Sequence, residues 1–195
     1  MKIDLADPTA VLVAASQALE TAGLQAATYG GLALAMYGEP RETKDADLAV
    51  ASFNAAEAEA ALRAAGFDLI RAFERVKFGG LLVSRLTLIG GIAGSLNTVD
   101  FVEPRSPRYA LDIQSRALTA TVRSRSLRVV APEDFVVLKV LATRERDLED
   151  AWTVLRGLGD QFDMVLMESV LRGLSAEISD YDFMARWRVI QKRAG

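Results

Sequence analysis

A pair of adjacent glycines between a strand-like and a helix-like segment constrains the fold of this chain most strongly. Residues 25–29 have the composition of a short strand and run directly into Gly30 and Gly31. Residues 32–37 favour a helix until a Gly-Glu-Pro sequence ends it, and the run "DADLAV" at 45–50 predicts a second strand. The glycines therefore lie at a strand-to-helix turn, which indicates a fold that mixes strands and helices.

The rest of the chain continues this alternation and then becomes helical. We expect an α+β fold, in which residues 1–130 form a small mixed β-sheet flanked by helices and residues 131–195 form a C-terminal helical subdomain that closes a cleft. The sequence predicts further helices at 8–22, 54–66, 107–119 and from 132 to the end, and further strands near 67–73, 81–89, 96–102 and 126–130.

The amino-acid composition excludes several kinds of chemistry. The 195 residues include neither cysteine nor histidine, which rules out the usual structural zinc sites, a cysteine nucleophile and any Ser-His-Asp arrangement. An enzyme built from this chain has to use carboxylates, lysines, arginines, hydroxyls or hard metal ions. No apolar run approaches the roughly 20 residues needed to cross a bilayer, and the first segment does not resemble an export signal, so we expect a cytoplasmic protein without a membrane partner.

Two aspartates in the second predicted strand suggest a metal site. Asp45 and Asp47 are two residues apart, so on a strand their side chains point to the same face, about 7 Å apart. Asp100, in the apolar run "LNTVDFVEP", is the best candidate for a third carboxylate, because a buried carboxylate without a cation is costly. Three such oxygen donors suit two Mg²⁺ ions, or Mn²⁺. A D-x-D pair alone more often marks a solvated turn or a strand end.

The double glycine is compatible with phosphate binding beside these aspartates. Glycine at a strand-to-helix turn lets the backbone approach a ligand closely, and the N-terminus of the following helix offers free N–H groups to phosphate oxygens. Gly30 and Gly31 are therefore candidate contacts to a triphosphate, although two glycines alone usually mark only a turn. The order of glycines, D-x-D pair and third aspartate favours the functional interpretation.

Three segments together resemble a known family. The string "YGGLALAMYGEPRETKDADLAV" closely resembles the signature of minimal nucleotidyltransferases in the DNA polymerase β superfamily, where a glycine turn precedes an Asp-x-Asp strand. The later "VDFVEP" resembles the strand that carries the third carboxylate of that superfamily. The segment "PEDFVVLKVLATRERDLEDAW" is similar to one in the AbiEii-like branch, the nucleotidyltransferase toxins of type IV toxin–antitoxin systems. The resemblance implies a nucleotidyltransferase-like core, and it departs from many relatives at Gly31, where they have serine.

The resemblance implies roles for individual residues. Asp45 and Asp47 would bind both Mg²⁺ ions, and Asp100 would bind one of them and help to activate the acceptor hydroxyl. Gly30 and Gly31 would cradle the triphosphate. Other positions that match the family pattern are Arg41 and Thr43 before the aspartates, Lys139 as a lysine that neutralises phosphate charge, and Asp147 and Asp150, for which no role follows.

Some of these positions also have a purely structural interpretation. Lys139 lies in an apolar helix, from which its ammonium group could extend to solvent. The charged residues between Arg144 and Asp150 could form the solvated start of a helix. Residues 101–130 contain six arginines and two acidic residues, although the whole chain has a net charge of −3. Within that stretch, Arg123, Arg125 and Arg128 could bind RNA or could form a solvated face.

The function implied by the resemblance is metal-dependent transfer of a nucleoside monophosphate from an NTP to an acceptor hydroxyl, with release of pyrophosphate. The toxin-like branch implies the 3′ end of tRNA or another RNA as the acceptor and a cognate antitoxin as a partner. A small molecule such as an aminoglycoside, or a protein hydroxyl, is an alternative acceptor. A non-catalytic antitoxin or interaction protein with the same fold is the alternative from another class, and the three carboxylates argue against it.

Overall fold

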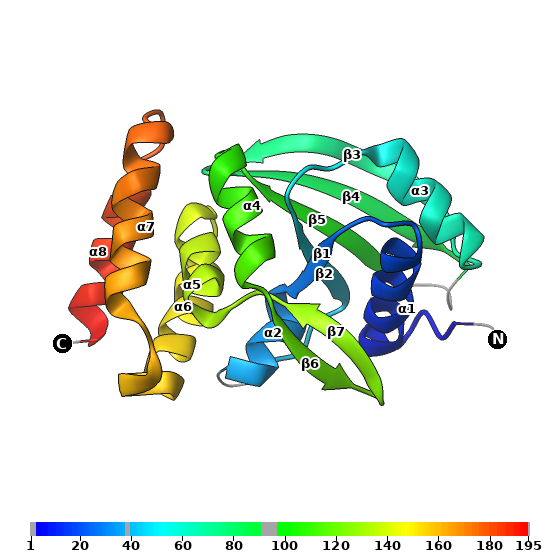
Figure 1. Ribbon diagram of the computed structural model, residues 1–195, viewed down its shortest axis with the longest axis horizontal. Coiled ribbons are helices and arrows are strands. Elements are labelled where there is room, and N and C mark those ends of the chain that lie inside the picture. The colour runs from blue at the N-terminus through cyan, green and yellow to red at the C-terminus, as the bar shows by residue number, and fades with distance from the viewer. Residues whose placement is uncertain (1–2, 38–39, 91–96, 195) are drawn as a thin grey trace.

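The computed structural model describes residues 3–37, 40–90 and 97–194, whose helices surround one mixed β-sheet (Figure 1). The helices are α1 Pro8–Thr21, α2 Gly30–Tyr37, α3 Ala55–Ala64, α4 Pro107–Arg116, α5 Pro132–Leu141, α6 Glu145–Leu158, α7 Met164–Glu177 and α8 Phe183–Ala194, with a 3₁₀ turn at Gly159–Gln161. The strands are β1 Ala26–Tyr29, β2 Asp45–Val50, β3 Asp68–Phe78, β4 Leu81–Ile89, β5 Thr98–Pro104, β6 Leu118–Val122 and β7 Arg125–Val129.

Local side-chain caps determine where several helices begin. The Asp7 carboxylate accepts hydrogen bonds from the backbone N–H groups of Thr9 and Ala10 at the start of α1. Asn54 and Ser106 cap α3 and α4 in the same way. These caps satisfy N–H groups that have no partner within the first turn of a helix, so the capping residues fix the helix starts.

The strands form one sheet in the order β3-β4-β5-β2-β1-β7-β6. The central pair, β2 and β5, is parallel, as is the pair of β1 and β7. The other neighbouring strands are antiparallel. This mixed sheet with flanking helices confirms the α+β class predicted from the sequence.

One face of the sheet is covered by α1 and α3. Leu12 of α1 and Leu62 of α3 belong to the same buried cluster as Leu48 of β2 and Phe101 of β5. Because successive residues of a strand point to opposite faces, the residues on either side of Leu48 and Phe101 point to the other face. The predicted aspartates of β2 and β5 therefore lie on the face away from α1 and α3.

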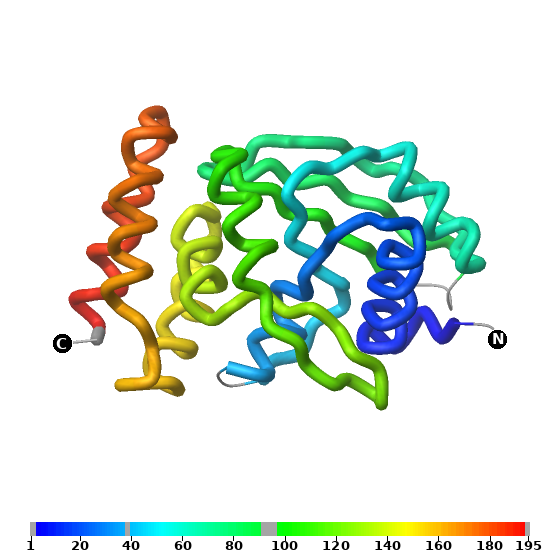
Figure 2. The backbone as a smooth tube through the Cα atoms, viewed as in Figure 1, coloured from blue at the N-terminus to red at the C-terminus, as the bar shows by residue number. Residues whose placement is uncertain are grey.

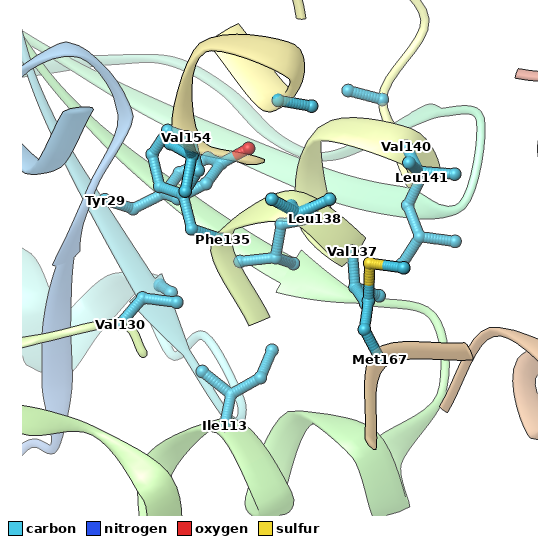
Figure 3. Packing of buried hydrophobic residues seen from close by; sticks show 14 of the residues in the cluster. Tyr29, Ile113, Val130, Phe135, Val137, Leu138, Val140, Leu141, Val154 and Met167 are labelled. Atoms are coloured by element: carbon cyan, nitrogen blue, oxygen red, sulfur yellow. The ribbon is translucent and has the colours of Figure 1, made fainter. Parts of the chain in front are cut away.

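The other face is covered by α4 and α5, and α6, α7 and α8 continue the same hydrophobic cluster. Figure 3 shows part of this cluster, where Tyr29 of β1 lies beside Phe135 of α5 with ring centroids 5.3 Å apart. The C-terminal helices form the end of the molecule opposite α1 (Figure 2). They share a core with the sheet, and a division of the chain at residue 130 stays a prediction.

The predicted helix at 107–119 is wrong at its end. α4 stops at Arg116, and Leu118–Val122 forms β6, which pairs with β7 in an antiparallel hairpin. The turn residues Arg123 and Ser124 both have positive φ, at 49° and 62°. Such values are typical of the two-residue turns that match the twist of a hairpin. The alternating, threonine-rich run "LTATV" before this turn contains the strand signal.

The other predicted elements are confirmed, with ends that differ by a few residues. The largest difference is in β3, which continues to Phe78. Gly38, Glu39 and Leu96, which the sequence placed at the end of a helix and the start of a strand, lie outside the described residues. Over the part of the chain that the structure describes, no helix has the length and apolar character needed to span a bilayer.

Candidate active site

The register of the central strands brings the three predicted aspartates together. Asp47 of β2 lies opposite Asp100 of β5, and Asp45 lies opposite Thr98. The Thr98 hydroxyl is 2.9 Å from Asp45 Oδ1 and 3.3 Å from Asp100 Oδ1, so it links the two carboxylates. Asp100 is buried, whereas Asp45 and Asp47 are partly exposed. Two neighbouring strands thus present three carboxylates on one face.

The surroundings of Asp47 oppose its ionisation. Burial and the neighbouring Asp100 raise the pKa of the Asp47 carboxyl to about 7, and the attraction of Lys139 offsets only part of this rise. Burial is the larger cause, and repulsion from Asp100 adds to it, so both disfavour the ionised form of Asp47. A bound cation would relieve that repulsion.

Both glycines pack directly against residues of the site. Gly30, the first residue of α2, has a φ of +64°, and a Cβ atom there would lie 1.9 Å from Asp47 Oδ2. A Cβ atom on Gly31 would lie 2.8 Å from Cβ of Thr43. Position 30 therefore requires glycine both for its backbone conformation and for space. Position 31 could not hold the serine found in many relatives unless Thr43 moved.

The loop before β2 supports the site through Thr43 and Arg41. The Thr43 hydroxyl donates to the backbone carbonyl of Asp45 at 3.3 Å and accepts from the Asp45 N–H at 3.4 Å. Arg41 donates from Nε and Nη2 to the two carboxylate oxygens of Asp150 in α6, both at 3.0 Å. Thr43 thus positions the start of β2, and Arg41 connects this loop to the C-terminal helices.

Lys139 of α5 is the centre of a buried ion network. Its Nζ lies 3.1 Å from Asp147 Oδ1 and 2.8 Å from Asp150 Oδ2, and only 1% of the side chain is exposed. The ammonium group also lies over the rings of Tyr29 and Phe135, 5.0 and 5.4 Å from their centroids. The interpretation in which Lys139 extends to solvent is therefore wrong.

Each carboxylate beside Lys139 also contacts an arginine. Arg144 donates to Asp147 from Nε and Nη2 at 3.1 and 3.0 Å, and Arg41 binds Asp150 as described above. Burial alone would raise the pKa of both carboxyls, but the neighbouring cations outweigh burial and hold each pKa below its ordinary value. We call these five residues, Lys139, Arg41, Arg144, Asp147 and Asp150, the Lys139 network.

Asp100 has a cation of its own, which the sequence analysis did not predict. Arg85 of β4 donates from Nε to Asp100 Oδ1 at 2.8 Å and from Nη2 to Oδ2 at 2.6 Å. Among the described residues, no group of three acidic side chains is arranged to hold a metal ion jointly. The donor type still fits Mg²⁺ or Mn²⁺, because carboxylate oxygens are hard ligands and because a cation would relieve the repulsion between Asp47 and Asp100.

The three aspartates, Arg85 and most of the Lys139 network line one cavity of about 650 Å³, a size typical of small-molecule sites. The three aspartates, Gly30 and Lys139 form part of its wall. Apolar side chains of the β3–β4 hairpin form another part, so the cavity offers both charged and apolar contacts. Its wall also includes the basic residues Arg41, Lys44, Arg85, Arg144 and Arg146 and the apolar residues Phe73, Phe78, Leu81 and Val83.

The three arginines predicted as an RNA contact lie elsewhere. Arg123, Arg125 and Arg128 belong to the β6–β7 hairpin, at the edge of the sheet opposite β3, and the described lining of the cavity includes no residue of this hairpin. Arg123 forms an ion pair with Asp7 at 2.6 Å, and Arg128 donates to the backbone carbonyl of Gln114. RNA binding by this hairpin stays a prediction.

Arg85 is the main site residue that the sequence analysis missed. A signal was present, because Arg85 lies in an apolar strand, where a charge favours an oppositely charged partner. Matching Arg85 with Asp100 across neighbouring strands would have required the strand order. That order depends on long-range pairing, which local patterns do not specify.

Comparison with known proteins identifies the family. The sequence profile described as "Nucleotidyl transferase AbiEii toxin, Type IV TA system" matches residues 14–180. A search among curated proteins gave no match.

Solved structures show the same fold at low sequence identity. The chain is similar to an antigenic nucleotidyltransferase-like protein from Paracoccidioides brasiliensis, with 17% identity, a TM-score of 0.50 and 88% of each chain covered. It is also similar to the antibiotic-resistance factor ANT(2″)-Ia, with 15% identity, a TM-score of 0.53, and coverage of 88% of this chain and 94% of that one. At these identities the likeness extends to the fold alone.

Proposed function

This chain belongs to the AbiEii family of nucleotidyltransferase toxins, and we propose that it transfers a nucleoside monophosphate from an NTP to an acceptor hydroxyl with the help of Mg²⁺ or Mn²⁺. One observation carries the proposal. Three carboxylates from β2 and β5 lie beside the N-terminus of α2 at a single cavity that is also lined by basic residues. Carboxylates for metal ions and N–H groups with cations for phosphates are the two requirements of this reaction.

Asp45, Asp47 and Asp100 are the residues that would hold the ions. Bound there, divalent ions would neutralise charge on the triphosphate and on the pyrophosphate that leaves. The raised pKa of Asp47 supports this assignment, because a cation removes the repulsion between Asp47 and Asp100.

The triphosphate would lie against the start of α2. Gly30 and Gly31 form the first turn of this helix, and the free N–H groups of a helix N-terminus attract anions. In this proposal Thr43 positions Asp45. Arg41 and Lys139 act on the nucleotide through the Lys139 network, in which three cations face two carboxylates and leave a net positive charge beside the cavity.

The chemical step needs little covalent help from the protein. The acceptor oxygen forms a bond to the α-phosphorus, the bond to the β-phosphate breaks, and pyrophosphate leaves. Asp100 would accept the proton of the acceptor hydroxyl. The protein contributes mainly by fixing the positions of charge, as in other phosphoryl transfers.

An RNA hydroxyl, such as a tRNA 3′ end, is the acceptor that the charges of the cavity favour. The described lining contains six basic residues and five acidic ones, and three of the acidic residues are assigned to metal ions. A polycationic aminoglycoside would find little spare acidic charge, whereas RNA phosphates would meet cations. Residues 131–195 would form one wall of this cavity, through Lys139 and the start of α6, and a toxin of this kind would have a cognate antitoxin.

The test is a transfer assay with the acceptor left open. The protein is incubated with each labelled NTP, Mg²⁺ and total cellular RNA, and in parallel with an aminoglycoside, with Asp45→Ala as the control. Label retained on RNA by the wild type alone supports the proposal, and label on the aminoglycoside alone assigns a small-molecule acceptor. Expression of the wild type should slow growth and Asp45→Ala should not. Equal growth arrest by both would indicate a binding mechanism without catalysis.

A further inference from the structure

We propose that Arg85 is a positioning residue that withholds Asp100 from the metal-binding set and releases it only when a divalent cation and an anionic substrate enter the cavity. The inference rests on the proposed function for the identity of the substrate. The competition between Arg85 and a metal ion for Asp100 is independent of the proposed function, because it is a property of the protein alone.

A continuous row of side chains across five strands carries the inference. The register pairs Phe73 of β3 with Arg85 of β4, Arg85 with Asp100 of β5, Asp100 with Asp47 of β2, and Asp47 with Tyr29 of β1. Residues opposite one another on neighbouring strands lie on the same face and contact each other. The side chain of Arg85 therefore lies on this face of the sheet, between the Asp100 carboxylate and the Phe73 ring.

The contacts of Arg85 occupy both oxygens of the third carboxylate. Nε and Nη2 bind Oδ1 and Oδ2 of Asp100 in a two-point arrangement, and the guanidinium carbon lies 5.7 Å from the centroid of the Phe73 ring. Charge-assisted pairs with this geometry are among the stronger hydrogen bonds in proteins. A metal ion that uses Asp100 has to displace at least part of this pair.

The ion pair between Arg85 and Asp100 stabilises the folded protein when the cavity contains no metal ion. Asp100 is 6% exposed and faces Asp47, so without Arg85 two neighbouring carboxylates would repel each other in a partly buried site. Arg85 therefore acts as a resident counter-ion. Once released, its guanidinium group lines the same cavity and is available to an anionic group such as a phosphate of the NTP or of an RNA acceptor.

The chain contains a matched ion pair outside the cavity. Arg75 of β3 donates from Nη1 to both carboxylate oxygens of Glu103 in β5, at 2.9 and 2.7 Å, and Glu103 is 8% exposed. Neither residue is among the described residues that line the cavity. Arg75→Gln thus removes a similar pair between the same two charge types without touching the three aspartates.

The experiment measures Mn²⁺ binding to the protein without nucleotide, by electron paramagnetic resonance of free Mn²⁺, for the wild type, Arg85→Gln, Arg85→Lys and Arg75→Gln. We expect Arg85→Gln to bind Mn²⁺ about 10-fold more tightly, or to bind an additional ion, because the change frees Asp100 and removes a positive charge beside the metal position. Arg85→Lys, which lacks the two-point fork, should fall in between. Arg75→Gln should bind Mn²⁺ like the wild type.

Nucleotide transfer gives the second measurement and separates this inference from the proposed function. Arg85→Gln should bind metal more tightly and yet transfer nucleotide more slowly, a combination that a merely structural role does not produce. A folded Arg85→Gln or Arg85→Lys variant with unchanged or weaker Mn²⁺ affinity overturns the inference, whatever the activity. If the wild type transfers no nucleotide but Arg85→Gln still gains Mn²⁺ affinity, the proposed function fails and the role of Arg85 stands.

Discussion

Two charged clusters line the same cavity, and they are balanced in opposite ways. In the Lys139 network, Asp147 and Asp150 each contact two cations, and their pKa values lie below the ordinary range. The three aspartates of β2 and β5 have one ion-paired cation, Arg85, and the pKa of Asp47 rises to about 7. The protein's own cations compensate the negative charge of the Lys139 network, whereas the negative charge of the three aspartates is left uncompensated.

This difference separates a structural from a functional use of buried charge. Compensated carboxylates hold α5 and α6 against the loop before β2, so they stabilise the fold. Uncompensated carboxylates cost stability, and a protein keeps them where a ligand supplies the missing charge. The positions of the two clusters, side by side at one cavity, allow the first to support the second.

The largest expected effect follows from removing charge at Asp47. Asp47→Asn should lower nucleotide transfer by at least about 10⁴-fold, as for other essential catalytic groups. The same change should leave stability unchanged or higher, because it removes repulsion from Asp100. Initial rates with labelled NTP and urea unfolding measure the two effects. Transfer at the wild-type rate would locate the activity elsewhere.

Removing the central cation of the other cluster should instead destabilise the fold. Lys139→Met leaves two buried carboxylates short of a partner and should cost about 3–5 kcal/mol in the free energy of unfolding. Lys44→Met, at an exposed position of the same cavity, is the control and should change stability by less than about 0.5 kcal/mol. Equal losses in urea midpoints for the two variants would mean that the network is not structural.

A glycine comparison tests how tightly α2 is fitted to the aspartates. Gly30→Ala places a methyl group against Asp47 at a positive φ and should cost roughly 2–4 kcal/mol. Gly23→Ala has a similar φ of +76° but open space around it, so it should cost only about 1 kcal/mol. Thermal unfolding of both variants measures the difference. If Gly30→Ala were no worse than Gly23→Ala, the close approach of α2 to Asp47 would be in doubt.

Stability should also respond to pH in opposite directions at the two clusters. The folded pKa values of Asp147 and Asp150 are lowered, so their contribution is complete above about pH 3.8 and is lost as the pH falls through the lowered values. The folded pKa of Asp47 is raised from 3.8 to about 7, so the protein should lose roughly 1–3 kcal/mol as the pH rises across that interval.

Urea unfolding at several pH values, in the absence of divalent ions, measures both contributions. Asp47→Asn should remove most of the loss between pH 4 and pH 7 and leave the acid side unchanged. Lys139→Met should reduce the stabilisation that the wild type loses in acid. A wild-type profile that is flat from pH 4 to pH 7 would show that the charge on Asp47 is compensated after all.

The sequence predicted the three aspartates of β2 and β5 better than it predicted the side chains that surround them. Spacing on a strand placed Asp45 and Asp47 on one face, and the cost of a buried charge singled out Asp100. Arg85 and the partners of Lys139 were not predicted, because they meet through strand order and helix packing. Local patterns carry periodicity, whereas contacts between β4 and β5 or between Arg41 and Asp150 depend on the whole topology.

The helix expected to reach residue 119 failed for a local reason, a two-residue turn at Arg123 and Ser124 that was not recognised.

The smallest expected effect concerns the β6–β7 hairpin, which lies outside both clusters. Among the described residues, the side chain of Arg125 is the one hairpin arginine side chain that forms no hydrogen bond or ion pair, since Arg123 binds Asp7 and Arg128 binds the Gln114 carbonyl. Replacing Arg123, Arg125 and Arg128 together by glutamine should therefore lower the salt dependence of RNA binding by about one phosphate contact, a slope change of roughly 0.7–0.9. NTP binding should not change, because the cavity lies elsewhere.

Filter-binding of labelled RNA across a range of salt concentrations measures that slope. A fall of two or three contacts would mean that the hairpin gives up its internal partners to bind RNA, and that the acceptor extends from the cavity to the far edge of the sheet. No change in slope would mean that the hairpin is a solvated face. RNA recognition would then depend on the basic residues that line the cavity, where Arg144→Gln and Arg146→Gln should lower the slope instead.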